Sequence, residues 1–405
     1  MLSLSKYLIF FLVFGANSIC LSAQKIPEAY YRLQAAIDIQ DKLKAQEWAD
    51  SCKEIKPIKY QYLIAIGEAN FLVENYSEAL SYFLKSESLR NGSASYLLAK
   101  TYCAIGDSAS CFEWLRKNLE STRREREHTI LLEPVFEKYH NSISWKNIWE
   151  KDWYNSLDKA IADAEYLNSN QNYEETLELL NARIKGTKSR YILYELRGDA
   201  YLHLDNFSAA IDDYSVAYKK SRKDPLYLVK IAQAQMAKKQ YQLAIKKLDD
   251  AVAESDGNPK FQLIRAKAYN EMGQPANGLE DIRYYIDFYP NDTKAIELLS
   301  QSAYDAGQYV DALFALAKLS KTNPNNPKYR YLRGLIYMKT EQMRLAIAEF
   351  DFAIVNEFNV MDSYFNKAIA LYNLGELKDA CKCFSISHQY GKFDAQEWLF
   401  KHCKN

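Results

Sequence analysis

The sequence predicts an all-α protein built as a solenoid of short helical hairpins, and three observations support this prediction. The chain has 405 residues but only 13 Gly and 9 Pro, a composition that favours helix. Small residues recur every 34 positions over about 60% of the chain, which is typical of stacked repeats. Within each period, apolar residues follow helical spacing, and Gly or Pro separates the helical stretches.

Three columns of residues define the period. Each column advances by 34 residues, and the second and third columns lie 12 residues before and four residues after the first. The first column is Thr176, Ala210, Ala244, Gly278, Ala312, Ala346 and Ala380. The second is Ala164, Gly198, Ala232, Ala266, Ser300, Gly334 and Ala368. The third is Leu180, Tyr214, Leu248, Ile282, Leu316, Phe350 and Phe384. We expect the two small columns to meet where the helices of a hairpin cross, because small side chains let backbones approach closely.

This pattern resembles the tetratricopeptide repeat (TPR) family. The resemblance implies a right-handed superhelix whose first helices line a concave face. Thr176 departs from the usual Ala, and Pro275 and Gly278 weaken one second helix. Some members grip a C-terminal carboxylate with a Lys and an Asn one turn apart. The matching pairs here lack that combination, so we expect no such clamp; they are Glu195/Asp199, Val229/Gln233, Leu263/Lys267, Glu297/Gln301 and Tyr331/Leu335.

The expected organisation has five parts. They are a signal peptide over 1–23, TPR-like repeats over 24–121, a connector with a Trp-rich helix over 122–156, a seven-repeat TPR array over 157–392 and a capping helix over 393–405. Trp145, Trp149 and Trp153 form an i, i+4, i+8 stripe in the connector, which we interpret as core; a stacking platform for a sugar is the alternative.

The two ends of the chain carry further expectations. Residues 1–23 combine Lys6, the apolar run 7–14 and a cleavage position after Ala23, which is typical of a secretory signal. Cys20 makes a lipoprotein possible, although Ile19 fits a lipid-attachment motif poorly. No later stretch is apolar enough to span a bilayer. In the capping helix we expect Trp398 and Leu399 to point inward, and Lys401, His402 and Lys404 outward.

Charge and motifs exclude several functions. The chain has 52 Lys+Arg against 52 Asp+Glu, whereas a general nucleic-acid binder needs a basic surplus. A phosphate-binding Gly-rich loop, His-Glu-x-x-His and Gly-x-Ser-x-Gly are all missing from the sequence. We therefore predict no enzyme activity, no cofactor and no metal. Carboxylate pairs such as Asp212-Asp213 and Asp249-Asp250 are expected to be solvated.

The cysteines leave alternatives open. Cys381, Cys383, His388, His402 and Cys403 are ligand types that suit zinc, but their helical spacing keeps them too far apart. Cys403 pairs with Cys381 or with Cys383, or all three remain buried thiols. A local bridge between Cys103 and Cys111 is a similar alternative.

The inward positions of the first helices fall into three zones. The first is acidic, with Glu165, Glu195 and Asp199; the second is mixed, with Lys260, Lys267, Asn270, Glu271 and Lys294. The third is apolar and is our candidate partner-binding site: Tyr331, Leu335, Met338, Phe365, Ile369 and Tyr372. Exposed apolar residues mark partner surfaces, although the capping helix or superhelical closure is an alternative way to bury them.

These observations predict an exported, non-catalytic scaffold that binds protein or peptide partners on its concave face. The expected location is the periplasm, with peripheral membrane association through a partner as an option. The alternative is a periplasmic helical protein that binds peptidoglycan or an oligosaccharide.

Overall fold

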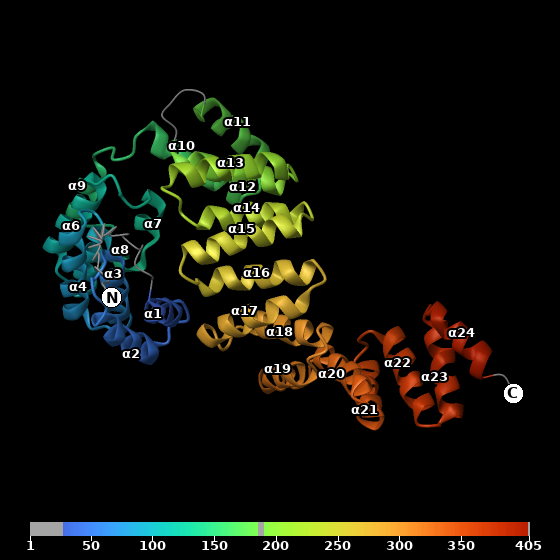
Figure 1. The fold of residues 1–405 in the computed structure, drawn as a ribbon. Helices are drawn as coiled ribbons and strands as arrows, with labels where there is room; N and C mark the ends of the chain where they lie inside the picture. Colours follow the sequence, from blue (N-terminus) through green and yellow to red (C-terminus); the bar gives the residue numbers. More distant parts are fainter. Residues whose placement is uncertain (1–26, 185–189, 404–405) are drawn as a thin grey trace, which may run out of the picture.

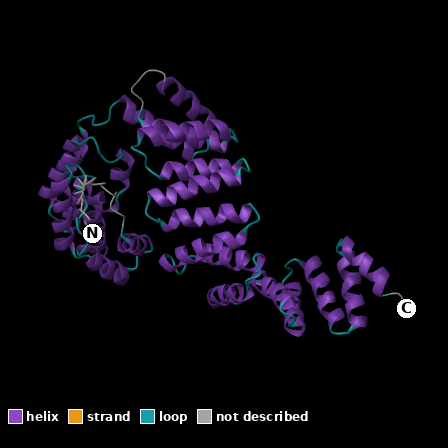
Figure 2. Cartoon of the chain, viewed as in Figure 1, coloured by secondary structure: helices purple, strands orange, loops and turns teal. Residues whose placement is uncertain are grey.

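The computed structural model describes residues 27–184 and 190–403, and these form 24 α-helices and no β-strand (Figure 2). The expected signal peptide over residues 1–23, with Cys20, lies outside the described residues, as does Lys404. Within the described part, no helix has both the length and the apolar character that a membrane span requires.

Three helical hairpins open the described chain, and three short helices follow them. The bounds are α1 Glu28–Asp38, α2 Lys42–Lys53, α3 Tyr60–Leu72, α4 Tyr76–Leu89, α5 Ser95–Ala104, α6 Ser108–Glu120, α7 Glu127–Leu132, α8 Pro134–Glu137 and α9 Ile143–Trp149. Asp41 and Asp107 begin the second helices α2 and α6 by accepting hydrogen bonds from the N–H groups of Lys44 and Ser110. Each cap satisfies an N–H that has no partner within its helix.

Seven further hairpins and one terminal helix complete the chain. The bounds are α10 Ser156–Ser169, α11 Tyr173–Ile184, α12 Tyr191–His203, α13 Phe207–Lys220, α14 Leu226–Ala237, α15 Tyr241–Glu254, α16 Pro259–Glu271, α17 Pro275–Phe288, α18 Thr293–Asp305, α19 Tyr309–Thr322, α20 Pro327–Lys339, α21 Met343–Val355, α22 Val360–Asn373, α23 Leu377–Gln389 and α24 Phe393–His402. The first helices of successive hairpins approach one another closely, as α14 does α16 and α20 does α22. The stack therefore curves with its first helices on the inner side.

The residues of all three predicted columns are buried, so the period reports the packing inside each hairpin. Where the large residue is aromatic, the small residue 16 positions earlier is often Gly. A Cβ on Gly198 would lie 2.7 Å from the Tyr214 ring, and one on Gly334 would lie 2.8 Å from the Phe350 ring. These aromatic rings occupy the space that an Ala side chain would need.

Arginines on the inner helices bind buried carboxylates on the second helices. Arg197 donates two hydrogen bonds of 2.7 Å to the carboxylate of Asp213, and a third to Asn181 of the preceding hairpin. Arg265, 68 residues later, binds Asp281 in the same way. The expectation that Asp213 is solvated is wrong: its exposed fraction is 5%, because a bidentate arginine compensates its burial.

The connector forms the core between the two groups of hairpins, as interpreted from its tryptophans. Trp145 and Trp153 have exposed fractions of 5% and 8%, and they pack with Phe136 and Ile148. The expected single helix is wrong in one respect. α9 ends at Trp149, so Trp153 follows the helix, and its indole N–H donates to the backbone oxygen of Ile148.

The chain closes on itself between α1 and α17. Figure 1 shows α1–α17 as a ring, with α18–α24 leaving it as an arm. At the closure, Tyr31 and Ala35 of α1 pack with Tyr285, Phe288 and Tyr289. The Tyr31 hydroxyl donates to the backbone oxygen of Ser255. Residues more than 200 positions apart therefore share one apolar cluster.

Polar contacts flank that cluster on both sides. Arg32 forms an ion pair of 3.1 Å with Asp287, and its guanidinium lies 4.7 Å from the centre of the Phe288 ring. Asp38, at the end of α1, accepts hydrogen bonds of 2.8 Å from both Lys260 and the Tyr289 hydroxyl. These contacts fix the lateral position of α1 on the edge of the array.

Two disulfides resolve the cysteine alternatives. Cys381 pairs with Cys403, and Cys103 pairs with Cys111, while Cys383 is a buried thiol. The Cys381–Cys403 bond ties the end of α24 to α23.

The capping helix differs from expectation at His402. Trp398 and Leu399 pack inward as predicted. His402 does so too, because its Nδ1 lies 3.1 Å from the Tyr372 hydroxyl and its ring packs on Trp398. The expectation that His402 points outward is therefore wrong.

Candidate partner-binding face

The apolar patch predicted from the sequence lies on two neighbouring inner helices of the arm. Its residues are Tyr331, Leu335 and Met338 on α20, and Phe365, Ile369 and Tyr372 on α22. All six are half-buried. The structure thus brings the six side chains onto one pair of packed helices and leaves part of each accessible.

Neighbouring helices cover part of the patch. Tyr331 packs edge-on against Phe350 and Phe358, with ring centres 5.8 Å apart in both cases. Phe365 packs on Phe384, and Tyr372 packs on Trp398 of the capping helix. The sequence left open that the capping helix buries the apolar patch. The capping helix does cover part of the patch, most clearly at Tyr372.

The carboxylates in the acidic zone of the inner face are engaged by other groups of the chain. Lys230 of α14 reaches back to α12 and forms ion pairs of 3.0 Å with Glu195 and 2.8 Å with Asp199. Burial alone would lower the pKa of Lys230, but the two carboxylates raise it overall. Hydroxyls of Tyr227 and Tyr214 donate to the same two carboxylates. One lysine against two carboxylates leaves one negative charge, but groups of the chain itself already bind both carboxylates.

The mixed zone contains a groove with an excess of positive charge. This lysine groove has a volume of about 280 Å³ and lies between α16, α18 and α20. Its charged residues are Lys267, Lys294 and Lys328 against Glu297. Glu297 accepts hydrogen bonds from the Tyr329 hydroxyl at 2.6 Å and from Lys328 at 2.9 Å, and these contacts lower its pKa.

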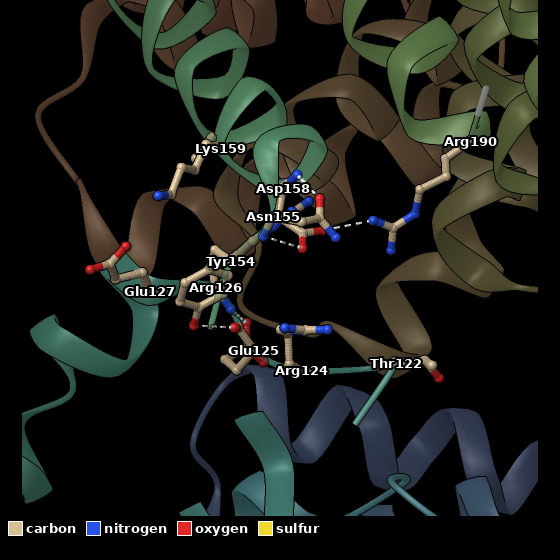
Figure 3. A pocket seen from close by; sticks show the side chains of 11 residues that line it. Thr122, Arg124, Glu125, Arg126, Glu127, Tyr154, Asn155, Asp158, Lys159 and Arg190 are labelled. Carbon is tan, nitrogen blue, oxygen red and sulfur yellow. Dashed lines mark hydrogen bonds and ion pairs between the residues drawn. The ribbon is translucent and has the colours of Figure 1, made fainter. Parts of the chain in front are cut away.

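A larger pocket of about 390 Å³ lies where the connector meets α10 (Figure 3). Its arginines are engaged in holding the junction together. Arg190 forms a 2.8 Å ion pair with Asp158, and Arg124 donates to the backbone oxygen of Trp153. Arg126 reaches Glu165 on α10 at 2.8 Å. We interpret this pocket as a structural joint of the ring.

Sequence reasoning missed the regularity of the lysines. Lys260, Lys294 and Lys328 are spaced by 34 residues, so each is the second residue of its helix in α16, α18 and α20. The period that identified the small columns would have found this one as well. Reading the mixed zone as a set of unrelated charges concealed it.

Comparisons with known proteins agree with this architecture. Residues 298–356 match the family model described as tetratricopeptide repeat. No curated protein matches the chain. The crystal structure of the C-terminal part of a TPR repeat-containing protein from Cytophaga hutchinsonii is 18% identical, with a TM-score of 0.50 over 59% of this chain and 99% of that one.

Two further solved structures have lower TM-scores. A tetratricopeptide repeat protein from Parabacteroides merdae is 14% identical and has a TM-score of 0.43, over 61% of this chain and 98% of that one. YrrB, titled a TPR protein with an unusual peptide-binding site, is 18% identical and has a TM-score of 0.40, over 48% and 97%. At such identities the likeness concerns the fold, and among these three the Cytophaga structure alone carries weight. The chain therefore has the solenoid fold of tetratricopeptide-repeat proteins, and residues 298–356 match the model of that family.

Proposed function

We propose that the protein is an exported scaffold, without catalysis of its own, that binds a protein or peptide partner on the inner face of its arm. One observation carries the proposal. The six residues of the apolar patch remain half-buried on α20 and α22 after packing among the described residues, and accessible apolar clusters mark interaction surfaces. The TPR family itself suggests an interaction scaffold, and its members are generally non-catalytic.

Export is supported by the cysteine chemistry. Of the six cysteines that follow residue 23, four form two disulfides. Disulfides persist in oxidising compartments. Together with the signal-like residues 1–23, this favours a periplasmic location. N-terminal sequencing of protein purified from its native cells should find Gln24 first. A chain that begins at Cys20 and incorporates labelled palmitate would identify a lipoprotein instead.

The alternative is a protein that binds peptidoglycan or an oligosaccharide on its Tyr- and Trp-rich faces. Sugar stacking needs an accessible aromatic face, whereas Trp145 and Trp153 are buried in the connector core. A fluorescence titration with peptidoglycan fragments should therefore leave the tryptophan emission unchanged.

The main test is affinity capture from the native envelope fraction, with variants of the patch compared side by side. Leu335→Ser combined with Met338→Glu places polar groups on the patch without touching the aromatic packing. We expect this double variant to lose the partner that the wild type captures, and to keep its helical circular dichroism.

Phe314→Glu provides a matched control on the outer side of the arm. Phe314 is 75% exposed on α19, so the change introduces a charge on an accessible apolar side chain away from the patch. Capture should survive this change. If Phe314→Glu abolishes capture and the patch variant does not, the partner binds the outer side and the proposal is wrong.

A further inference from the structure

The lysine groove continues directly into the apolar patch. Lys328 is the second residue of α20, and Tyr331 and Leu335 follow it at three and seven residues, spacings that place side chains on one face of a helix. Lys294 and Lys267 extend the positive side to α18 and α16. The inner face from α16 to α22 therefore has a basic end and an apolar end along one line.

The chain itself shows how this lysine column holds carboxylates. Lys260 and the Tyr289 hydroxyl both bind Asp38 at 2.8 Å. Lys328 and the Tyr329 hydroxyl bind Glu297 in the same manner. Two of the three equivalent lysines thus already hold a carboxylate together with a tyrosine hydroxyl.

Two lysines of the groove, Lys294 of the column and Lys267 of α16, have no such partner among the described residues. Lys294 and Lys267 are exposed, and within residues 27–184 and 190–403 no ion pair or hydrogen bond engages their amino groups. The groove has three lysines and one glutamate, which leaves an excess of two positive charges. Excess charge on the wall of a groove attracts ligands of opposite sign.

We propose that the lysine groove binds the carboxylates of an acidic peptide segment whose following apolar residues occupy the patch. This inference rests on the proposed function and specifies the partner. Packed helices lie about 10 Å apart, and an extended peptide rises about 3.3 Å per residue. The two steps from α18 to α22 thus separate the acidic from the apolar residues by roughly six positions.

The test uses the full chain, immobilised, and two pools of synthetic 12-residue peptides. The acidic pool has Asp or Glu at two adjacent positions and Leu, Phe or Tyr about six positions later. Its twin has Asn or Gln in place of the acids. The chain should retain the acidic pool about tenfold better than the twin, and 0.5 M salt should remove the difference because it screens exposed charges.

Lys267→Gln combined with Lys294→Gln should abolish that preference. Lys318→Gln combined with Lys321→Gln removes the same charge from α19, a second helix, and should preserve it. Equal retention of both pools, retention of neither, or an unchanged preference in the groove variant would overturn the inference. So would displacement of the peptides by a 20-nucleotide single strand, which would indicate a general polyanion site.

The two proposals can fail separately. If the Leu335→Ser/Met338→Glu variant loses its captured partner but the wild type shows no preference for acids, only the charge inference fails. If the acidic preference holds and the patch variant still captures its partner, the peptide binds the groove without the apolar patch, and the proposed site is wrong.

Discussion

The ring and the arm consist of the same helical hairpins but differ in what holds them. Beyond α18, the described hairpins of the arm pack chiefly on their neighbours, as is usual for repeat arrays, whose stability is a sum of local terms. The ring adds one contact between helices distant in sequence, since α1 packs on the edge formed by α15–α18. Closure therefore constrains the curvature of α1–α17, whereas the described hairpins beyond α18 depend chiefly on packing between neighbours.

This difference separates the two inner faces in function. Around α12 and α14 in the ring, the inner charges of Glu195, Asp199 and Lys230 interact with one another. Where the ring meets the arm, Lys267 of α16 and Lys294 of α18 lack a partner within the described chain, and the apolar patch on the arm is half-exposed. We infer that most of the ring acts as a rigid base and that the arm, together with the adjoining α16, presents the binding surface.

Opening the ring should have the largest effect, because it removes the contact that distinguishes the ring from the arm. Tyr31→Ala removes a buried aromatic from the closure, and such truncations cost about 3–5 kcal/mol. We expect the radius of gyration measured by X-ray scattering to rise while helix content stays constant. Tyr166→Ala, at an exposed tyrosine of α10, is the matched control and should leave the scattering unchanged. A Tyr31→Ala protein with wild-type scattering would mean that other contacts suffice for closure.

The disulfides should affect the arm more than the ring. The Cys381–Cys403 bond closes 22 residues, and loop-entropy estimates give it about 3 kcal/mol. Replacing both cysteines with Ser should speed amide hydrogen exchange in α24 by about 100-fold, because the bond ties the end of α24 to α23. Replacing Cys103 and Cys111, which close 8 residues within the ring, should leave exchange in α24 at its wild-type rate. Faster exchange in α24 from the second change would show that ring and arm are coupled.

Alkaline pH should open the ring through its tyrosines. Burial raises the pKa of Tyr30 to about 12, and it raises the pKa values of Tyr31, Tyr285 and Tyr289 as well. Below pH 10 these phenols are neutral whether exposed or buried, so their stabilising contribution is complete. Between pH 10 and 12 the exposed forms ionise first, so closure weakens as pH rises.

Tyrosinate absorbance and scattering should report this opening together. Tyr30→Phe keeps the ring packing but removes one ionisable group, so it should move the opening to higher pH. If scattering stays constant up to pH 12, the phenols do not control closure.

The sequence predicted the hairpins far better than the way they close. The 34-residue columns report contacts inside a hairpin and between neighbours, so they anticipated the burial of Gly198 against Tyr214. Closure depends on small rotations between hairpins that add up along the stack, and such rotations produce no periodic pattern in the sequence. The sequence feature that could have indicated closure is the two tyrosine pairs Tyr30-Tyr31 and Tyr284-Tyr285, which pack together there.

The candidate site was predicted to a similar degree. The helical faces of α20 and α22 followed from the repeat, so the six patch residues could be assigned to one surface. The position of the capping helix could not be derived from the repeat, because the inward orientation of His402 depends on packing with Tyr372 and Trp398. The choice of Cys381 over Cys383 as the partner of Cys403 depends on the same packing.

The finest comparison uses the glycine–aromatic pairs that occur in both regions. Adding a Cβ at Gly198 in the ring or at Gly334 in the arm overlaps an aromatic ring. Overpacking costs about 1–3 kcal/mol, and the better helix propensity of Ala returns up to about 1 kcal/mol. We expect thermal unfolding to show a net loss of about 1–2 kcal/mol, larger for Gly198→Ala because closure prevents its hairpin from spreading.

A compensating substitution separates overlap from a general effect of the new methyl group. The hairpin with Ala232 has Leu248 in the large column, so Gly334→Ala with Phe350→Leu reproduces a pair that this chain already uses. The double variant should be more stable than the sum of the single changes predicts, because the smaller side chain leaves room for the methyl group. If the two changes are additive, the small and the large columns pack independently of each other. The ring and the arm would then differ only in the contact made by α1.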